Sequence, residues 1–387
     1  MKIKITFFII TTFIQASISI FAQSDFHIKY GPYLQNIGEN EATVVWVTNK
    51  NALGWIEIAP DDKTSFYAEE RPQYVETING RKVTGTLHRV TIKNLQKGTT
   101  YRYRVYSREV LDDINWDVKY GKITATNPSR LFSFTTLNSS ENETHFAVVN
   151  DIHARNEVLD SLLKNVSIKD LDFIVFNGDL VSHLNSEEQM FEGFLNKSVE
   201  LFASNLPFFF TRGNHETRGP FSTRFMDYFP TSTGKPYYTF RQGPAYFIML
   251  DSGEDKPDSD IEYGGLSAFD EYRIEQAEWL KKIVESKEFQ EAPLKIVAIH
   301  IPAFTSTWYG TLKVEETFIP ILNKIGINLM ICGHTHRHSY LPTGEKNNNF
   351  PILTNSNNEI MDIKITGQKI QINIFDTKGN RTKRIDL

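Results

Sequence analysis

The sequence predicts a multidomain fold in which an all-β sandwich precedes an α/β domain. Two patterns lead to this prediction. Up to about Leu137 apolar residues alternate with polar ones, whereas after His145 short continuous apolar runs alternate with helical stretches. Alternation with a period of two is typical of strands buried on one face, and continuous apolar runs between helices are typical of strands buried on both faces. The length of 387 residues agrees with more than one domain.

The N-terminal part, residues 25–137, has the pattern of antiparallel strands. Residues 43–48 and 89–93 alternate between the two faces of a strand, and Asn, Gly and Asp residues separate such runs. In residues 101–105 two tyrosines and a valine share one face while two arginines share the other. This arrangement is typical of a sandwich of two antiparallel sheets.

The C-terminal part, residues 145–387, follows a polar linker at 138–144 and has the pattern of an α/β layer fold. A hairpin at 363–374 is expected to close it. The buried strands are predicted at 146–149, 173–176, 208–210, 246–250, 296–299 and 329–331. The helices between them are predicted at 157–166, 187–203, 271–286 and 316–324.

Residues 1–23 have the pattern of an export signal peptide. Lys2 and Lys4 precede an apolar run from Phe7 to Phe21, and cleavage is predicted near Ala22 or Gln23. A membrane anchor is the alternative, but this run is shorter than the ~20 apolar residues that a membrane-spanning helix needs. We therefore expect a periplasmic or secreted protein with no membrane anchor.

The composition excludes several classes of protein. The chain has 42 basic and 47 acidic residues, a net charge of −5, so a nucleic-acid partner is not indicated. Cys332 is the only cysteine, so no internal disulfide can form. The sequence carries no signal for an oligomeric state.

Polar residues of metal-ligand type follow almost every predicted buried strand of the second domain. Ligands of α/β sheets collect at strand ends, and the glycines at 178, 213 and 333 permit a close backbone approach. One such cluster alone would more often be a helix cap or a turn. The clusters are, in order, Asp151-Ile152-His153, Gly178-Asp179, Gly213-Asn214-His215-Glu216, His300 and Gly333-His334-Thr335-His336.

The donor types suit first-row transition ions. Carboxylate, amide oxygen and imidazole favour zinc, manganese or iron, whereas so many histidines disfavour calcium. The sequence thus indicates a site for two divalent or first-row transition metal ions (Zn, Mn or Fe).

In these ordered motifs the second domain resembles the calcineurin-like metallophosphoesterase superfamily, which implies a four-layer αββα sandwich. The resemblance also implies attack of a metal-bound hydroxide on a small phosphorylated substrate, with His215 assisting the leaving group. By the same resemblance, Asp151, His153, Asp179 and His336 hold the first metal ion, and Asp179 as the bridge, Asn214, His300 and His334 hold the second.

The first domain resembles the fibronectin type III-like domain that precedes the catalytic domain in purple acid phosphatases. The resemblance rests on Leu95, the segment 97–103 with Tyr101 and Tyr103, and the segment 31–35. The metal site departs from the same enzymes at two positions. They carry a tyrosine three residues after the bridging aspartate, where this chain has Ser182, and they usually lack the histidine that is His153 here. Ferric iron and a purple colour are therefore not implied.

Arg212 and Arg218 flank the 213–216 turn and are candidates for binding the substrate phosphate. Ordinary surface arginines are the alternative. Trp308 and Tyr309 follow the His300 turn and could form an aromatic wall that selects the leaving group, or they could pack in the core or in a lid.

Hydrolysis of phosphate monoesters is the leading functional hypothesis, because the order of the two domains is that of purple acid phosphatases. A phosphodiesterase or nucleotide pyrophosphatase could use the same ligands, and the motifs do not separate these activities. A catalytically silent binding scaffold is a third possibility, which the intact ligand set disfavours.

Overall fold

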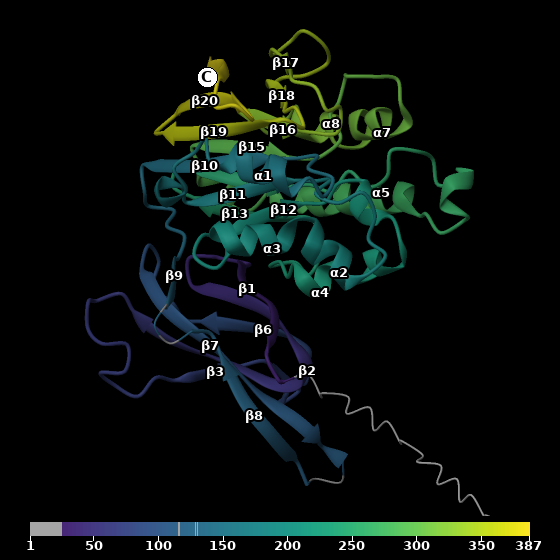
Figure 1. Ribbon diagram of the computed structural model, residues 1–387. Helices are drawn as coiled ribbons and strands as arrows, with labels where there is room; N and C mark the ends of the chain where they lie inside the picture. Colours follow the sequence, from purple (N-terminus) through teal and green to yellow (C-terminus); the bar gives the residue numbers. More distant parts are fainter. Residues whose placement is uncertain (1–24, 115–116, 128, 130) are drawn as a thin grey trace, which may run out of the picture.

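The structure is a computed structural model that describes residues 25–114, 117–127, 129 and 131–387. The predicted export signal at 1–23 lies outside the described residues. An all-β domain is followed along the chain by a larger α/β domain, and the two pack against each other (Figure 1). The predicted fold class is confirmed. Among the described residues, no helix is both long and apolar enough to cross a bilayer.

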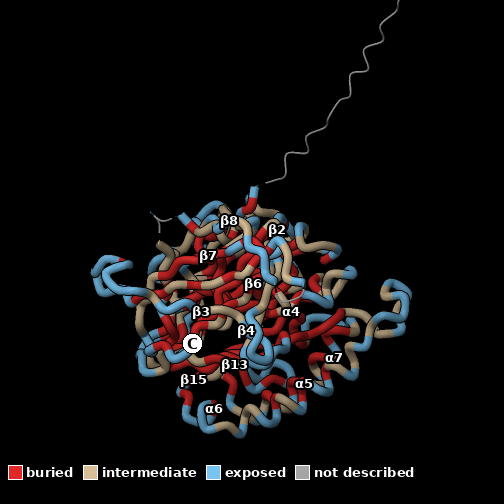
Figure 2. Tube along the Cα trace, turned by 90° about the horizontal axis from the view of Figure 1, so that it is seen from below, coloured by how far each residue is buried: buried red, intermediate tan, exposed pale blue. Residues whose placement is uncertain are grey.

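The N-terminal domain is organised around one long strand, β2. The first half of β2 pairs with β1 and β6, and after a register shift between Val47 and Ala52 its second half pairs with β3 and β7. Buried residues run through the middle of β2, β6 and β7 (Figure 2). The described strands are β1 (Ile28–Gln35), β2 (Glu41–Pro60), β3 (Gln73–Val75), β4 (Thr77–Ile78), β5 (Arg81–Lys82), β6 (Thr84–Lys93), β7 (Thr100–Asp112), β8 (Lys119–Ala125) and β9 (Phe132–Thr135).

The tyrosine-rich segment at the start of β7 makes hydrogen bonds both within the N-terminal domain and to the second domain. The backbone N–H of Gln96 donates to the hydroxyl of Tyr101 at 2.9 Å, a bond to the backbone just upstream that is typical of a tyrosine corner. The hydroxyl of Tyr103 donates to the carbonyl of Ser204 in the second domain at 2.7 Å. Ser204 in turn donates to the carbonyl of Pro32 at 2.7 Å. These buried hydrogen bonds therefore connect the two domains directly.

Two sheets form the centre of the α/β domain, each of six strands among the residues described. In spatial order, the first sheet contains β12 (Phe208–Thr211), β11 (Phe173–Asn177), β10 (Glu143–Val149), β19 (Glu359–Thr366), β20 (Lys369–Asp376) and β21 (Arg381–Asp386). The second contains β13 (Tyr238–Gln242), β14 (Ala245–Met249), β15 (Leu294–Ala298), β16 (Leu329–Cys332), β18 (Ile352–Thr354) and β17 (Ser339–Leu341).

Helices cover the outer faces of both sheets, which gives the four layers. The described α-helices are α1 (Asn156–Leu163), α2 (Glu187–Met190), α3 (Asn196–Ser198), α4 (Phe225–Tyr228), α5 (Phe269–Ile283), α6 (Lys287–Glu291), α7 (Tyr309–Thr317) and α8 (Ile319–Leu322). Shorter 3₁₀ turns occur at Ile168–Asp170, His215–Thr217, Pro220–Arg224 and Ile261–Tyr263.

Aromatic rings join the two sheets at their inner faces. Phe209 of β12 stacks on Phe240 of β13 with ring centroids 3.6 Å apart, and Phe173 of β11 meets Phe247 of β14 edge to face at 5.3 Å. Along β10, Phe146 and Val148 face this inner layer, while Ala147 and Val149 face the outer helices. Each central strand is therefore buried on both sides, as the continuous apolar runs predict.

Three of the differences between the predicted element bounds and the structure have clear physical causes. Strand β10 begins at Glu143, inside the predicted 138–144 linker, because Glu143 and Thr144 pair with the end of β19. The predicted helix at 187–203 forms, but π-helical turns at Phe191–Leu195 and Val199–Ala203 follow α2 and α3, so the helix alternates between α and π geometry. The predicted helix at 316–324 begins earlier, at Tyr309, and is divided at Phe318 just before Pro320.

Candidate metal centre

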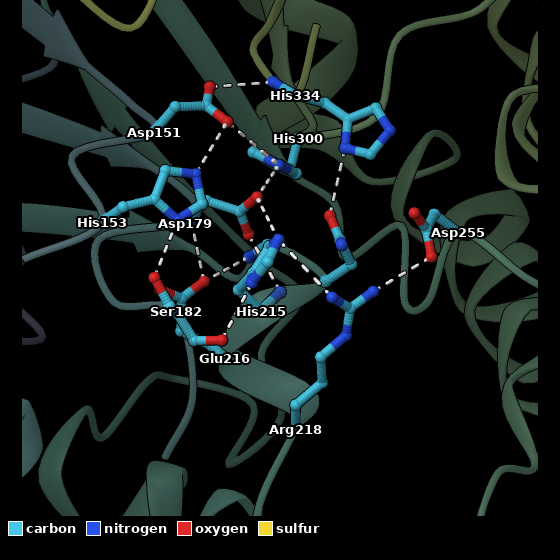
Figure 3. A network of polar contacts seen from close by, with 12 residues as sticks. Asp151, His153, Asp179, Ser182, His215, Glu216, Arg218, Asp255, His300 and His334 are labelled. Carbon is cyan, nitrogen blue, oxygen red and sulfur yellow. Dashed lines mark hydrogen bonds and ion pairs between the residues drawn. The ribbon is translucent and has the colours of Figure 1, made fainter. Parts of the chain in front are cut away.

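The candidate site lies where the carboxyl ends of strands from both sheets meet. Asp151 and His153 follow β10, Asp179 follows β11, and Asn214 follows β12, all in the first sheet. His300 follows β15, and the pair His334 and His336 follows β16, in the second sheet. Each strand is anchored by buried apolar residues, so the polar residue after it is delivered to one edge of the domain. In Figure 3 the labelled ligand side chains of Asp151, His153, Asp179, His300 and His334 lie close together at this edge.

One group of donor atoms gathers around Asp151. Its Oδ1 lies 3.2 Å from Nε2 of His336 and 3.9 Å from Nε2 of His153. The two imidazole Nε2 atoms are themselves 3.1 Å apart. These three residues have the proximity of a metal-binding group.

A second group gathers around Asp179. Its Oδ2 lies 3.0 Å from Nε2 of His300, and both residues are buried. Nδ1 of His334 lies 3.1 Å from Oδ1 of Asn214. Asp179, His300 and His334 again have the proximity of a metal-binding group. The structure thus brings together all seven residues that the sequence suggests as ligands.

Two buried atoms in the centre lack a hydrogen-bond partner among the described residues: Oδ1 of Asp151 and Nε2 of His300. His300 Nε2 is close to Asp179, but their geometry is not that of a hydrogen bond. His300 Nδ1 lies 2.7 Å from the carbonyl oxygen of Asn177, so Nδ1 carries a hydrogen and donates it. The other ring nitrogen, Nε2, is therefore the position that a cation, either a proton or a metal ion, can take. Since buried polar atoms are rarely left without partners, these atoms fit a site built for metal ions.

The electrostatics of the site favour bound positive charge. Burial lowers the pKa of His300, but the carboxylates of Asp179 and Asp151 outweigh burial and raise that pKa to about 10. Burial opposes ionisation of Asp179, yet the neighbouring His300 and His215 lower its pKa. A buried carboxylate pair beside an imidazole attracts a cation, whether a proton or a metal ion.

His153 and His334 are suited to ligation in their neutral form. Burial lowers the pKa of His153 to about 4 and that of His334 to about 4. Both imidazoles are therefore deprotonated at neutral pH, as a metal ligand must be.

His215 approaches the centre without being needed in either group of the predicted ligand set. Its Nδ1 lies 2.9 Å from the carbonyl oxygen of Ser182, so Nδ1 donates and Nε2 faces the site. Nε2 lies 3.8 Å from Oδ2 of Asp179 and 3.5 Å from Nη1 of Arg218 (Figure 3). Ser182 also supports His153, since its Oγ lies 3.4 Å from His153 Nδ1.

The backbone at the site is sharply bent. Asp151, His153, Asp179, His334 and His336 have positive φ, between 48° and 69°. This region is unfavourable for residues with a Cβ, and such strain is concentrated at functional sites. Close approach is visible at Gly213, where an added Cβ would lie 2.2 Å from Oδ1 of Asp179. The turns therefore tolerate unfavourable conformations in order to present these side chains.

Glu216 is a buried residue of the site to which the sequence analysis gives no role. Its Oε2 accepts from the backbone N–H groups of Asp179 at 2.8 Å and Gly213 at 2.9 Å. Its Oε1 accepts from Leu180 at 2.7 Å and Val181 at 3.3 Å. Burial and the nearby Asp179 raise its pKa to about 7, while the four backbone donors favour the charged form. The acidic residue in the 213–216 motif is the sequence signal for this anchor.

Asn150 and Asn355 form a second support that the sequence analysis misses. Asn150 donates to Asp151, and Asn355 Nδ2 donates to Asn150 Oδ1 at 2.8 Å. Asn355 is 205 positions away along the chain. An asparagine just before the Asp151 motif is the available sequence signal, but nothing local identifies its partner.

The two arginines beside the 213–216 turn have different environments. Arg212 donates to the buried Asp251 through Nε at 2.8 Å, and its guanidinium lies over the rings of Phe269 and Tyr272. The guanidinium of Arg212 therefore packs against side chains of helix α5.

Arg218 pairs with Glu254 at 3.0 Å and with Asp255 at 3.1 Å, while Nη1 reaches His215. Burial lowers the pKa of Arg218, but these carboxylates outweigh burial and raise it. Of the two arginines, Arg218 is the one in contact with the candidate site.

Two protein families match this chain, one over each domain. The calcineurin-like phosphoesterase family matches residues 144–338, and the purple acid phosphatase N-terminal domain family matches residues 31–136. A solved structure of a purple acid phosphatase from yellow lupin (Lupinus luteus) seeds superimposes with a TM-score of 0.65 at 14% identity. The match covers 92% of this chain and 73% of the lupin chain, and it shows a shared fold.

Curated relatives are also phosphatases. Purple acid phosphatase 22 of Arabidopsis thaliana is 25% identical over 275 residues, which are 66% of this chain and 54% of the relative. Acid phosphatase type 7 of Mus musculus is 28% identical over 169 residues, which are 42% of this chain and 34% of the relative. The chain thus spans about half the length of the first of these relatives and a third of the second. The match over residues 144–338 shows that this chain belongs to the calcineurin-like phosphoesterase family, here joined to an N-terminal domain of the purple acid phosphatase type.

Proposed function

We propose that this protein is a metal-dependent phosphoesterase that hydrolyses phosphate monoesters. The observation that carries the proposal is the convergence of two carboxylates, four imidazoles and one amide. Two of their buried atoms have no hydrogen-bond partner in the part of the chain that the structure describes. Similarity to acid phosphatases supports the choice of monoesters.

Two ions would be held by overlapping sets of residues. The first set is Asp151, His153, Asp179 and His336, and the second is Asp179, Asn214, His300 and His334. Ions of this kind supply Lewis acidity, which activates a water molecule and neutralises charge on the phosphoryl oxygens. The carboxylates of Asp151 and Asp179 offset the positive charge that this chemistry needs, and the burial of both residues excludes competing solvent from the donor atoms.

His215 is assigned the protonation of the leaving-group oxygen. Its Nδ1–H is committed to the carbonyl of Ser182, which fixes the ring and directs Nε2 to the site. When Nε2 is protonated, it can pass that proton to the departing alkoxide. The N–H of Arg218 that lies 3.5 Å from Nε2 in the neutral ring is then available to a phosphoryl oxygen, while Arg218 keeps its pair with Glu254. Arg212, paired with Asp251, is assigned a structural role.

The donor set suits zinc, manganese or ferrous iron. Ser182 occupies the position at which purple enzymes have a tyrosine, and its hydroxyl supports His153 at 3.4 Å. The purified protein is therefore expected to lack a strong visible absorption band.

The test of this assignment is a His215→Ala variant with full metal content. Without the acid, turnover of phenyl phosphate is expected to fall by roughly 10²–10⁴-fold, with a smaller loss for 4-nitrophenyl phosphate, whose leaving group needs less protonation. The exposed His27→Ala is the matched control. A His215→Ala variant that keeps both metal ions and full turnover would contradict the role of His215.

Activity on a phosphodiester distinguishes the proposed monoesterase from its main alternative, a phosphodiesterase. Bis(4-nitrophenyl) phosphate is expected to be a poorer substrate than 4-nitrophenyl phosphate, measured as kcat/KM with the same metal. A reversed preference would identify a phosphodiesterase on the same site.

Export is part of the proposal. We expect the mature protein to begin near Ser24 and to be found in the periplasm or the medium, because residues 1–23 have the signal pattern. N-terminal sequencing of the protein from each cell fraction measures both the start of the mature chain and its location. A protein found only inside the cells with Met1 retained would contradict the proposed export.

A further inference from the structure

An exposed tryptophan stands beside the candidate metal centre. Trp308 is 64% exposed, and its ring lies edge to face with the imidazole of His334, with centroids 6.4 Å apart. Tryptophan is rarely left this open to water, and exposed aromatic rings beside a polar site are typical of binding surfaces. Its neighbour Tyr309 is used differently, since its hydroxyl bonds to Asp270 of helix α5.

The backbone that carries Trp308 is firmly held. The N–H of Trp308 donates to Ser306 Oγ at 3.2 Å, and Ser306 Oγ lies 3.1 Å from Oγ1 of Thr311. One position further, the N–H of Gly310 donates to the carbonyl of Asp255 at 3.0 Å. A Cβ at Gly310 would lie 2.8 Å from Cα of Asp255, so the start of α7 sits directly against that residue.

This contact links Trp308 to the groups proposed to act on the leaving group. Asp255 pairs with Arg218, and Arg218 reaches Nε2 of His215. Trp308 also touches the centre through His334. The ring is therefore an exposed flat surface on a backbone held by hydrogen bonds, and it lies on the side of the centre where His215 is proposed to protonate the leaving alcohol.

We propose that Trp308 stacks on an aromatic ring of the substrate's leaving alcohol, so that the preferred substrates are phosphate esters carrying a nucleobase or a similar ring. This inference rests on the proposed phosphoesterase function and narrows its substrate class. Stacking between a base and an aromatic side chain is strong enough to decide between otherwise identical esters.

Adenosine 5′-monophosphate and ribose 5-phosphate give the sharpest test, because they share the same leaving hydroxyl and differ in the base. We expect the metal-loaded enzyme to favour the nucleotide in kcat/KM. Trp308→Ala should reduce kcat/KM for the nucleotide by about tenfold and leave that for ribose 5-phosphate nearly unchanged. Trp308→Phe should retain most of the preference. Leu312→Ala, half exposed on the next turn of α7, is the matched control.

An equal loss on both substrates, or no loss on either, would overturn the proposal. A binding measurement distinguishes a failure of the stacking proposal from a failure of the proposed phosphoesterase function. Quenching of tryptophan fluorescence by the nucleotide, absent in Trp308→Phe, supports the stacking even if no ester is hydrolysed. Hydrolysis of both esters without such quenching refutes the stacking alone.

Discussion

The side-chain amide of Asn150 donates to Oδ2 of Asp151 at 2.6 Å, with both residues fully buried. The backbone N–H of His334 donates to the same oxygen at 2.9 Å. Oδ2 is thus committed to the protein, while Oδ1 faces the imidazoles of His153 and His336. The pair of donors decides which oxygen of the carboxylate is available to a metal ion, and so it orients the ligand before any ion binds.

Asn150→Ala is therefore expected to weaken metal binding. Loss of a group that supports a ligand typically costs about 10–100-fold in metal affinity. Competition with a chelator of known affinity measures the effect, and the exposed Asn347→Ala is the control. Wild-type affinity in Asn150→Ala would show that the backbone of His334 is sufficient to orient Asp151.

Glu216→Gln is expected to destabilise the protein even without metal. Each carboxylate oxygen accepts two backbone N–H groups, so in either orientation the new amide turns its NH₂ toward two donors. Leaving such buried groups unpaired predicts a loss of about 2–4 kcal/mol in the free energy of unfolding.

Denaturant unfolding of the metal-free protein measures this loss. The comparison is Glu188→Gln, which breaks a largely exposed pair with Lys29 and should cost under about 1 kcal/mol. Equal stabilities of the two variants would disprove the anchoring role of Glu216.

His88 predicts an acid-sensitive N-terminal domain. It is buried against Trp46, and burial lowers its pKa from 6.5 to about 4. Between these values the unfolded chain binds more protons than the folded one, so this contribution to stability is complete above pH 6.5 and is lost as the pH falls toward 4.

The loss attributable to His88 amounts to at most ~3 kcal/mol. Unfolding free energies at pH 7 and pH 4 measure it, with His88→Gln as the variant that cannot titrate. If the variant loses as much stability on acidification as the wild type, other groups cause the change.

Much of the fold follows from the sequence because strand burial leaves a local pattern. Val148 and Val149 face different layers, yet both are apolar, and that continuity predicts a strand covered on both sides. The sequence pattern does not predict helix α7 over its full length, because Gly310 and Thr311 are poor helix formers. Its start is instead held by the contact of Gly310 with Asp255, which is a tertiary effect.

The seven candidate ligands are predictable because each follows a strand in a recognisable motif. The residues that hold these ligands in place are harder to predict from the sequence. Asn150 and Asn355 meet only when β10 and the segment after β18 are placed side by side, and Glu216 acts through backbone groups that carry no sequence signal. Short polar residues in turns have many possible partners, and the fold selects among them.

The most direct test of the central claim is the number of metal ions bound per chain. Protein loaded with zinc or manganese and freed of excess ion should contain two ions per chain by elemental analysis. Asp179→Asn, which alters the residue shared by both sets of ligands, should lose both. A wild-type protein that retains one ion or none, or an Asp179→Asn variant that retains two, would contradict a two-metal centre bridged by Asp179.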